Sequence, residues 1–422
     1  WTARGLTAGG VYGRIRALTL PTPGRFFLRD LTRHSVLFPL RARVHHADAD
    51  TLGEQLRLVS IPAPPLGEAE RGAWVLERFR AIGLADVRAD EAGNVVGTWA
   101  ADGADGAPVV VAAHLDTVFP AGTEVTPRHE GKRIYAPGIT DNCRGLAGML
   151  AIARVLAESG PAAQRPVVFA ATVGEEGIGD LRGVKHLFRE NSPLRQAAAF
   201  VALDGSGMRR IVHRAIGSRR LRVEVTGPGG HSWSDRGAAN PIVALGAAAA
   251  EIGTLARPEP QRSALTVARM AGGSSVNAIP ESAWMELDMR SEVADALARM
   301  EESVRGVLVR AVDEENGSRR MGTEPLRLKV TVIGDRPSGE TPAGPPRVRA
   351  AMDITGSLGS PPELVGSSTD ANVPMALGIP SIAMGVGGDS GGIHTLDEWY
   401  SNDGGALGVE RGLLVVLVAA GA

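Results

Sequence analysis

Three short, uninterrupted apolar runs limit the folds that are open to this chain. They are PVVVAAHLD (108–116), PVVFAATV (166–173) and AAFVALD (198–204). A run without polar alternation suits a strand that is buried on both faces, as in parallel sheets. Between the first two runs lies an Ala- and Leu-rich segment of helical length, 145–159. Strands that alternate with helices predict an α/β domain with a mostly parallel sheet and helices on both faces.

A different pattern occupies residues 216–336. Strands and helices are expected in the order 220–227 (strand), 241–255 (helix), 263–273 and 283–291 (strands), 293–315 (helix) and 326–334 (strand). This βαββαβ order is that of a ferredoxin-like sandwich, which can form a small domain of its own. A Pro/Gly-rich link follows, and after it the sequence again has the pattern of buried strands and helices that is typical of an α/β domain. We therefore predict an inserted domain, 216–336, within a domain built from 48–215 and 337–422. The N-terminal extension, 1–47, has no assigned role.

Size and charge exclude several classes of protein. The 422 residues are enough for two domains. A formal net charge of −2 and an aromatic content of 4% offer no surface for nucleic acid and no attraction to an anionic membrane. The longest apolar run, at 412–422, is shorter than the roughly 18 residues that a membrane span needs.

Cysteine content and the N-terminal residues bear on location. The single cysteine, Cys143, excludes an intrachain disulfide and leaves the compartment open. Residues 1–45 are rich in arginine, but they lack the apolar core and small-residue cleavage site of a signal peptide. Our expectation is a cytoplasmic protein.

Acidic and histidine side chains follow the predicted buried strands. They are His114, Asp116, Asp141, Glu175, Glu176, Asp204 and His394. Each lies beside glycine or at the end of an apolar run, and open α/β sheets bind their ligands at the carboxyl ends of strands. Mixed histidine and carboxylate ligands suit zinc, with cobalt or manganese as substitutes.

The number of these residues favours two metals. The candidate ligands are His114, Asp141, Glu176, Asp204 and His394. Five ligands are too many for one open zinc site, but they suit two zinc ions that share a bridging carboxylate and a water. Asp116 can accept a hydrogen bond from the ring nitrogen of His114 that is not on the metal. Of Glu175 and Glu176, one would bind metal and the other would take the proton of the water.

Each of these residues also has a simpler interpretation. Asp141 could cap the following helix, Glu175 and Glu176 could form a solvated turn, and Asp204 could be a turn residue. The histidines could be packed or surface residues. We favour the metal site because all of them coincide at successive strand ends. Cys143 is interpreted as a semi-buried thiol near the site rather than a nucleophile.

Together these motifs resemble a known family. HLDTV, the aspartate of GITDN, GEEG, LDG and GGIHTLDEW occur in the order found in the two-zinc exopeptidases and deacylases. That family includes tripeptide aminopeptidase (peptidase T), glutamate carboxypeptidase, aminoacylase and succinyl-diaminopimelate desuccinylase. The resemblance runs from about Asp48 to the C-terminus. It implies that the inserted domain is a lid through which two copies form a homodimer.

The resemblance also implies a role for each residue of the site. It assigns His114 and Asp204 to one metal, Glu176 and His394 to the other, and Asp141 to both. Glu175 would be the general base, and Asp116 would orient His114. One departure concerns the NCRG sequence after Asp141, where relatives usually carry a lysine and a second glycine. The resemblance places Cys143 and Arg144 of this segment beside the metals.

Three motifs of the inserted domain match positions that contact substrate in the family. GPGGHSW carries His231, which would reach into the partner's active site in a dimer. NAIP carries Asn277, and LDMRS carries Arg290. Their simpler interpretations are a loop histidine, a turn asparagine and an arginine paired with Asp288.

The substrate class is the last inference from the sequence. In the family, aspartate at the position of Asp204 is typical of aminopeptidases and dipeptidases. The segment SSTDANVP (367–374) resembles the tripeptidase branch, and its Asp370 and Asn372 would line the pocket or cap a helix. We therefore expect an aminopeptidase for di- or tripeptides. The alternatives are an N-acyl amino acid deacylase or carboxypeptidase, and a non-catalytic binding protein with the same fold, against which the complete set of ligands and base argues.

Overall fold

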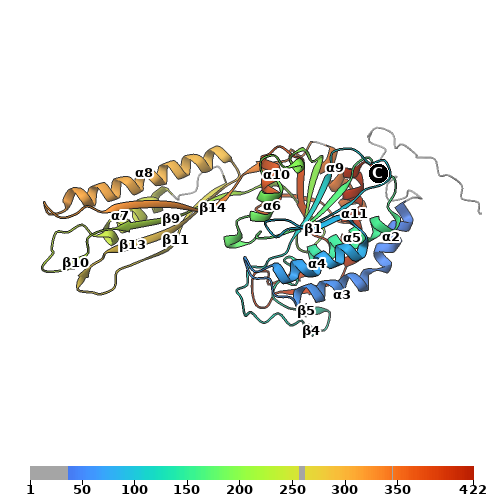
Figure 1. Cartoon of the computed structure of the whole chain (residues 1–422), viewed down its shortest axis with the longest axis horizontal. Helices are drawn as coiled ribbons and strands as arrows, with labels where there is room; N and C mark the ends of the chain where they lie inside the picture. Colours follow the sequence, from blue (N-terminus) through green and yellow to red (C-terminus); the bar gives the residue numbers. More distant parts are fainter. Residues whose placement is uncertain (1–36, 256–261, 345) are drawn as a thin grey trace, which may run out of the picture.

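The computed structural model describes residues 37–255, 262–344 and 346–422. A broad α/β domain and a slender unit that projects from it give the molecule an elongated shape (Figure 1). Within these residues, no helix is both long enough and apolar enough to cross a membrane.

A mixed nine-stranded sheet forms the centre of the larger domain. Its order is β1 (Ala85–Ala89), β2 (Val95–Trp99), β6 (Val167–Thr172), β3 (Val109–His114), β7 (Ala199–Leu203), β17 (Ser381–Met384), β8 (Arg210–Ala215) and β15 (Gly339–Glu340), and β16 (Glu363–Ser367) pairs with β8. The central strands β6, β3, β7 and β17 are parallel. The outer pairs β1–β2, β2–β6 and β17–β8 are antiparallel. The three apolar runs therefore form the parallel core that was predicted.

Helices cover both faces of this sheet, as the uninterrupted apolar runs predicted. Val109 and Val111 of β3 join the core on one face, and Val110 and Ala112 join the core on the other. The first face packs against α2 (Leu37–His46), α3 (Asp48–Val59), α4 (Ala69–Ile82), α5 (Cys143–Ser159), α9 (Pro346–Ser357) and α11 (Gly405–Ala420). The second face packs against α6 (Arg182–Leu187) and α10 (Asn372–Ala376).

The N-terminal helices bear on the predicted extension 1–47. Helix α2 packs on α5 and α11, and Leu37, Leu40 and Val44 are buried in the same core as the sheet. Residues 1–36 lie outside the described residues. Part of the predicted extension thus contributes apolar side chains to the larger domain.

The projecting unit has the predicted βαββαβ order. Its elements are β9 (Gly217–Thr226), α7 (Pro241–Leu255), β11 (Ser263–Gly272), β13 (Ser282–Ser291), α8 (Ala294–Ser318) and β14 (Arg327–Arg336). The four strands form an antiparallel sheet in the order β11-β13-β9-β14. The buried residues Leu221, Val223 and Val225 alternate along β9 and pack with α7 and α8, so this unit has its own apolar core.

Two small sheets complete the fold. β10 (Gly230–His231) pairs with β12 (Ala278–Ile279) at the end of the projecting unit that is far from the larger domain (Figure 1). β18 (Asp389–Gly391), β19 (Trp399–Ser401), β5 (Arg133–Tyr135) and β4 (Arg128–Glu130) form a four-stranded sheet in the larger domain. The connection between β18 and β19 carries His394, so this small sheet supports one of the candidate ligands.

Candidate active site

The candidate ligands converge from separate elements on one cavity of about 570 Å³. His114 ends β3, Asp204 directly follows β7, and Glu176 lies just beyond β6. Asp141 precedes α5, and His394 comes from the connection between β18 and β19. All five side chains line the cavity. The carboxyl ends of parallel strands thus bring three of these residues together, and Asp141 and His394 join them from other connecting segments.

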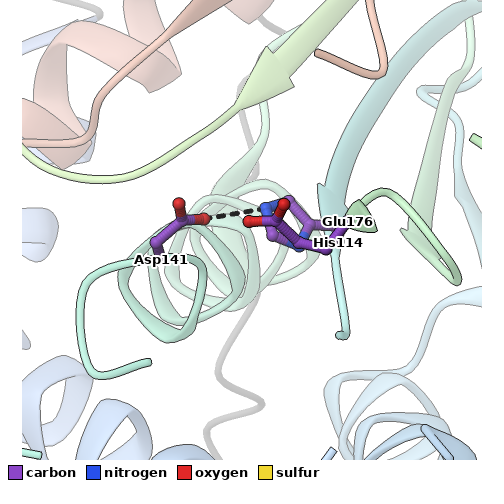
Figure 2. A group of neighbouring side chains, drawn as sticks. All are labelled: His114, Asp141 and Glu176. Atoms are coloured by element: carbon purple, nitrogen blue, oxygen red, sulfur yellow. Dashed lines mark ion pairs between the residues drawn. The ribbon is translucent and has the colours of Figure 1, made fainter. Parts of the chain in front are cut away.

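Asp141 occupies the centre of this group. Its Oδ1 lies 3.0 Å from Nε2 of His114, and its Oδ2 lies 3.0 Å from Nε2 of His394. Oε1 of Glu176 is also 3.0 Å from Nε2 of His394, and Oδ1 of Asp204 is 3.9 Å from Nε2 of His114. Figure 2 shows His114, Asp141 and Glu176 pointing toward a common centre. The distances form two pairs with Asp141 between them.

The donor atoms of this group fit a metal ion. One ligand atom each from His114, Asp141 and Glu176 lies within 4.8 Å of the other two. Oδ1 of Asp141 is buried and, within the described residues, has no hydrogen-bond partner, although it lies 3.0 Å from His114 Nε2. A buried carboxylate oxygen without such a partner is costly unless a cation meets it. The set of imidazole nitrogens and carboxylate oxygens is the type that zinc prefers.

The protonation of the histidines supports the same interpretation. Hydrogen bonds with Asp141 and then Glu176 raise the pKa of His394 to about 10. Burial would lower the pKa of His114, but the neighbouring carboxylates of Asp116, Asp141 and Asp204 hold that pKa well above its ordinary value. Without a metal, therefore, protons on the two imidazoles balance the carboxylates. A bound cation would replace these protons, because a histidine ligand must be neutral.

Asp116 makes contacts that differ from the predicted one. Its carboxylate accepts the main-chain N–H groups of Glu175 and Glu176, at 3.0 and 2.7 Å. Nδ1 of His114 lies 3.0 Å from the main-chain oxygen of Asp116 and 3.6 Å from its Oδ1. The main-chain oxygen is thus the nearer partner of the ring, and the carboxylate chiefly holds the Glu175–Glu176 segment.

Glu175 is buried beside the ligands, with 5% of its surface exposed. Burial raises the pKa of this carboxyl well above its ordinary value, and Arg336 opposes the rise. Nη1 of Arg336 lies 3.3 Å from Oε1 of Glu175, and Nη2 donates to the main-chain oxygen of Glu175 at 2.5 Å. Arg336, which ends β14 at the start of the Pro/Gly-rich link, was not among the residues predicted from the sequence.

Glu398 is a second residue of the site that was not predicted from the sequence. Its carboxylate accepts the main-chain N–H groups of Gly138, Thr140 and Asp141, at 2.8 to 3.1 Å. Burial raises the pKa of Glu398 to about 7, although these hydrogen bonds lower it. In the sequence, the position of Glu398 within the motif GGIHTLDEW was the one feature that could have indicated a role in the site. Glu398 fixes the segment that presents Asp141 to the cavity.

The three residues predicted to contact substrate lie in different places. Arg290 lines the cavity, and its Nε donates to Asp288 at 2.7 Å. His231 and Asn277 lie together at the remote end of the projecting unit, where the N–H of Ser232 donates to the main-chain oxygen of Asn277 at 3.0 Å. Neither of them lines the cavity of its own chain.

Cys143 and Arg144 are part of the core rather than the cavity. Burial raises the pKa of the Cys143 thiol to about 11, which does not suit a nucleophile. The guanidinium of Arg144 is fully buried and donates to the main-chain oxygens of Val386 and Gly405. It also lies 5.3 Å from the ring centroid of Tyr400. Arg144 therefore stabilises the packing of the C-terminal segments.

The prediction that Asp370 and Asn372 line the pocket is wrong, because neither borders the cavity. Asp370 is buried and accepts the hydroxyl of Thr172 at 2.5 Å. Nδ2 of Asn372 donates to the main-chain oxygens of Ile216 and Pro337, at 2.9 and 3.0 Å. Asn372 thus holds the two chain segments that enter and leave the projecting unit.

Comparison with known proteins agrees with this architecture. The model of Peptidase family M20/M25/M40 matches residues 110–416. The uncharacterized protein YqjE of Bacillus subtilis is 27% identical over 366 residues, which cover 82% of this chain and 92% of that protein. Aminopeptidase PepT from Bacillus cereus superposes with a TM-score of 0.71 at 24% identity, covering 88% of this chain and 99% of that one. A tripeptidase from Staphylococcus aureus superposes with a TM-score of 0.73 at 24% identity, covering 88% and 98%.

Proposed function

The chain belongs to Peptidase family M20/M25/M40, and from this premise we propose that it is a two-zinc aminopeptidase acting on di- and tripeptides. Membership of the family makes the protein a metallopeptidase or aminohydrolase. The observation that carries the proposal is the position of Asp141 between His114 and His394, beside the buried pair Glu175 and Glu176.

Two zinc ions fit the two pairs of ligands. His114 and Asp204 would hold one ion, His394 and Glu176 the other, and Asp141 both. When bound, the ions supply Lewis acidity toward the substrate carbonyl and the attacking water. One oxygen of Asp141 faces each histidine, as a bridging carboxylate requires.

Glu175 would move the proton in the reaction. It lines the cavity next to Glu176 but makes none of the close contacts with the two histidines. Its carboxylate would accept a proton from the attacking water and return it to the leaving amine. Burial, which raises the pKa of Glu175, suits a group that must both take and release a proton near neutral pH.

Arg290 would hold the terminal carboxylate of a short peptide. Its side chain borders the cavity, and within the described residues its two Nη nitrogens have no partner, because Asp288 binds only Nε. A guanidinium can grip a carboxylate with two parallel hydrogen bonds. Position 204 also supports the aminopeptidase assignment. It is an aspartate in this chain, whereas carboxypeptidases and deacylases of the family tend to have glutamate at the corresponding position.

A comparison of a free tripeptide with its N-acetylated form tests the proposal. The purified protein, loaded with zinc, is expected to release the N-terminal residue of the free tripeptide and to cleave the acetylated form more slowly. The Glu175→Gln variant is the control for a contaminating peptidase. Faster cleavage of the acetylated substrate would contradict the aminopeptidase assignment.

One observation favours a second candidate, an N-acyl amino acid deacylase or carboxypeptidase. Four arginines line the cavity, namely Arg210, Arg220, Arg290 and Arg336. Such a lining suits a substrate with a carboxylate close to the bond that is cleaved. Release of acetate or of a C-terminal residue in the same comparison would favour this candidate.

We also propose that two copies form a homodimer through the projecting unit, which would act as a lid. The support is the position of His231 and Asn277, which are exposed at the remote end of that unit. We propose that a residue so far from its own cavity contacts substrate in the site of a neighbouring subunit.

A further inference from the structure

The loop of residues 174–180, between β6 and α6, carries both Glu175 and Glu176 and is held on two sides. From the larger domain, the buried carboxylate of Asp116 accepts the N–H groups of both glutamates. On its other side the loop meets the lid root, by which we mean residues 217–220 of β9 and 334–336 of β14. The loop with the proposed base is therefore in direct contact with the projecting unit.

Three residues of the lid root bind this loop. Nη1 of Arg220 donates to the main-chain oxygen of Gly177 at 2.7 Å. The N–H of Asp335 lies 3.0 Å from each carboxylate oxygen of Asp180. The third residue, Arg336, is the one that contacts the base itself. Each of these contacts joins the projecting unit to a loop of the larger domain.

The guanidinium of Arg336 contacts Glu175 through both of its terminal nitrogens. One terminal nitrogen, Nη2, donates to the main-chain oxygen of Glu175 at 2.5 Å. The other, Nη1, lies 3.3 Å from Oε1 of Glu175 and donates to the hydroxyl of Ser368 at 3.1 Å. Nε lies 4.0 Å from Oδ1 of Asp180. Only 5% of Arg336 is exposed, and a buried guanidinium is costly unless such partners meet it.

The shape of arginine explains why a single side chain can do this. A guanidinium presents its donors in a rigid plane, so two nitrogens can bind the main chain and the carboxylate of one residue together. A lysine carries one compact charge and cannot hold both groups in a fixed geometry. Arg336 therefore restrains both the path of the loop and the direction of the Glu175 carboxylate.

The backbone that carries Arg336 is itself fixed. The next residue, Pro337, accepts a hydrogen bond from the side-chain amide of Asn372, and the same amide nitrogen binds the main-chain oxygen of Ile216. Both connections of the projecting unit are thus tied to the larger domain at one residue. Arg336 lies at this fixed end rather than at the remote end.

We propose that Arg336 is the positioning residue for Glu175. It clamps the loop 174–180 to the lid root and directs the Glu175 carboxylate into the cavity. This inference rests on the proposed role of Glu175 as general base. Arg336 takes no part in the proton transfer itself, because both of its terminal nitrogens are engaged by Glu175.

Hydrogen exchange of the metal-free protein tests the clamp independently of activity. Arg336→Met is expected to increase amide exchange in residues 174–180 by about tenfold or more, because local opening becomes easier. Arg219→Met is the matched control, since Arg219 lies on the same root and pairs with Glu301 and Asp335 at 3.0 and 3.1 Å. Unchanged exchange in Arg336→Met, or an equal increase in Arg219→Met, would overturn the proposal.

Kinetics of the zinc-loaded variants on a tripeptide test the consequence for Glu175. Arg336→Met is expected to lower kcat by about 10- to 100-fold with KM within about twofold and an unchanged zinc content, because a misdirected base slows only the chemical step. Arg336→Lys is expected to recover part of kcat. A higher KM at constant kcat would show that Arg336 binds substrate, and the positioning role would be wrong.

Two further outcomes keep the test decisive. If Arg336→Met fails to fold, Arg336→Lys takes its place in the exchange experiment, and exchange as slow as in the wild type would contradict the clamp. If the wild-type protein cleaves no amide substrate, the proposed function fails. In that case, faster exchange confined to 174–180 in the Arg336 variant would still support the positioning of this loop.

Discussion

Asp141 and the next residue, Asn142, have different roles, one in the proposed metal site and the other in the helix that follows. The sequence allowed Asp141 to be the cap of the following helix, but Asn142 is the cap of α5, because its Oδ1 accepts the N–H of Gly145 at 3.0 Å. The carboxylate of Asp141 is therefore free to face His114 and His394. Neighbouring polar residues at a helix start cannot be assigned by residue type alone, since both aspartate and asparagine cap helices well.

The two adjacent glutamates should respond differently to substitution by glutamine. Glu175→Gln should keep its zinc while kcat falls by about 10²- to 10⁴-fold, because only the proton acceptor is removed. Glu176→Gln should lose zinc as well as activity, since Glu176 is a proposed ligand. Metal content by elemental analysis, together with kcat on a tripeptide, measures both effects. Full activity and equal zinc content in both variants would contradict these roles.

Asp370 should make the free energy of unfolding depend on pH. Burial raises the pKa of Asp370 to about 6, against a hydrogen bond from Thr172 that lowers it, and the ordinary value is 3.8. Because the pKa is higher in the folded state, the contribution of Asp370 to the free energy of unfolding is full below about pH 4. It is lost as the pH rises through about 6. Asp370→Asn removes this titration.

Urea unfolding of the metal-free protein measures this effect. Between pH 4.5 and 7.5, the free energy of unfolding of the wild type should fall by about 2 kcal/mol relative to Asp370→Asn. Asp403→Asn is a suitable control, because Asp403 is exposed and, among the described residues, pairs with the exposed Lys132 alone. The same difference between wild type and Asp370→Asn at both pH values would show that the buried carboxyl does not titrate as described.

Among the elements of the larger domain, the strands that the apolar runs predicted are those that bury both faces. β3, β6 and β7 are almost entirely buried, so their apolar runs are visible without any knowledge of partners. The short strands β18 and β19 have three residues each and include polar residues and glycine. Their pairing depends on β5, which lies far away in the sequence, so the support of His394 could not be predicted.

Two residues that hold the site in place, Arg336 and Glu398, could not be recognised from the sequence. Arg336 and Glu175 are 161 positions apart, and Glu398 and Thr140 are 258 apart. Asp116, Glu398 and Arg336 act largely through main-chain N–H and C=O groups, which every residue type possesses. A motif reveals which side chains take part in chemistry, but it does not reveal which backbone segments need a partner.

The boundaries of the projecting unit follow from its first and last strands. β9 begins at Gly217 and β14 ends at Arg336, so we propose that the inserted domain comprises residues 216–336. Its core of residues on β9, β13, α7 and α8 is separate from the cores of the larger domain. The contacts of Asn372 with Ile216 and Pro337 define where the chain enters and leaves.

At the scale of the whole molecule, the elongated shape separates residues that the proposed reaction brings together. His231 lies in β10, at the remote end of the projecting unit (Figure 1). The cavity, in contrast, is lined by residues of the larger domain together with Arg220, Arg290 and Arg336. The outer strand β11 pairs with β13 on one side. Its other edge could pair with the same strand of a second copy around a twofold axis. Such a dimer would carry His231 of one subunit toward the other.

Mixing two inactive variants tests this arrangement. Glu175→Gln lacks the base but retains His231, and His231→Ala lacks the histidine but retains the base. In a mixed dimer, the site of the His231→Ala subunit receives His231 of the partner subunit and is complete. With random pairing, half of the dimers are mixed and half of their sites are complete, so activity should reach about one quarter of the wild-type value.

The control pairs Glu175→Gln with Glu176→Gln. These variants cannot complement each other, because each chain needs both glutamates in its own cavity, where Glu175 and Glu176 follow the same strand. Light scattering establishes whether dimers form before activity is measured on a tripeptide. A fully active monomer, or mixed dimers that remain inactive, would show that His231 does not act across an interface. The cavity would then have to be completed by movement of the projecting unit within one chain.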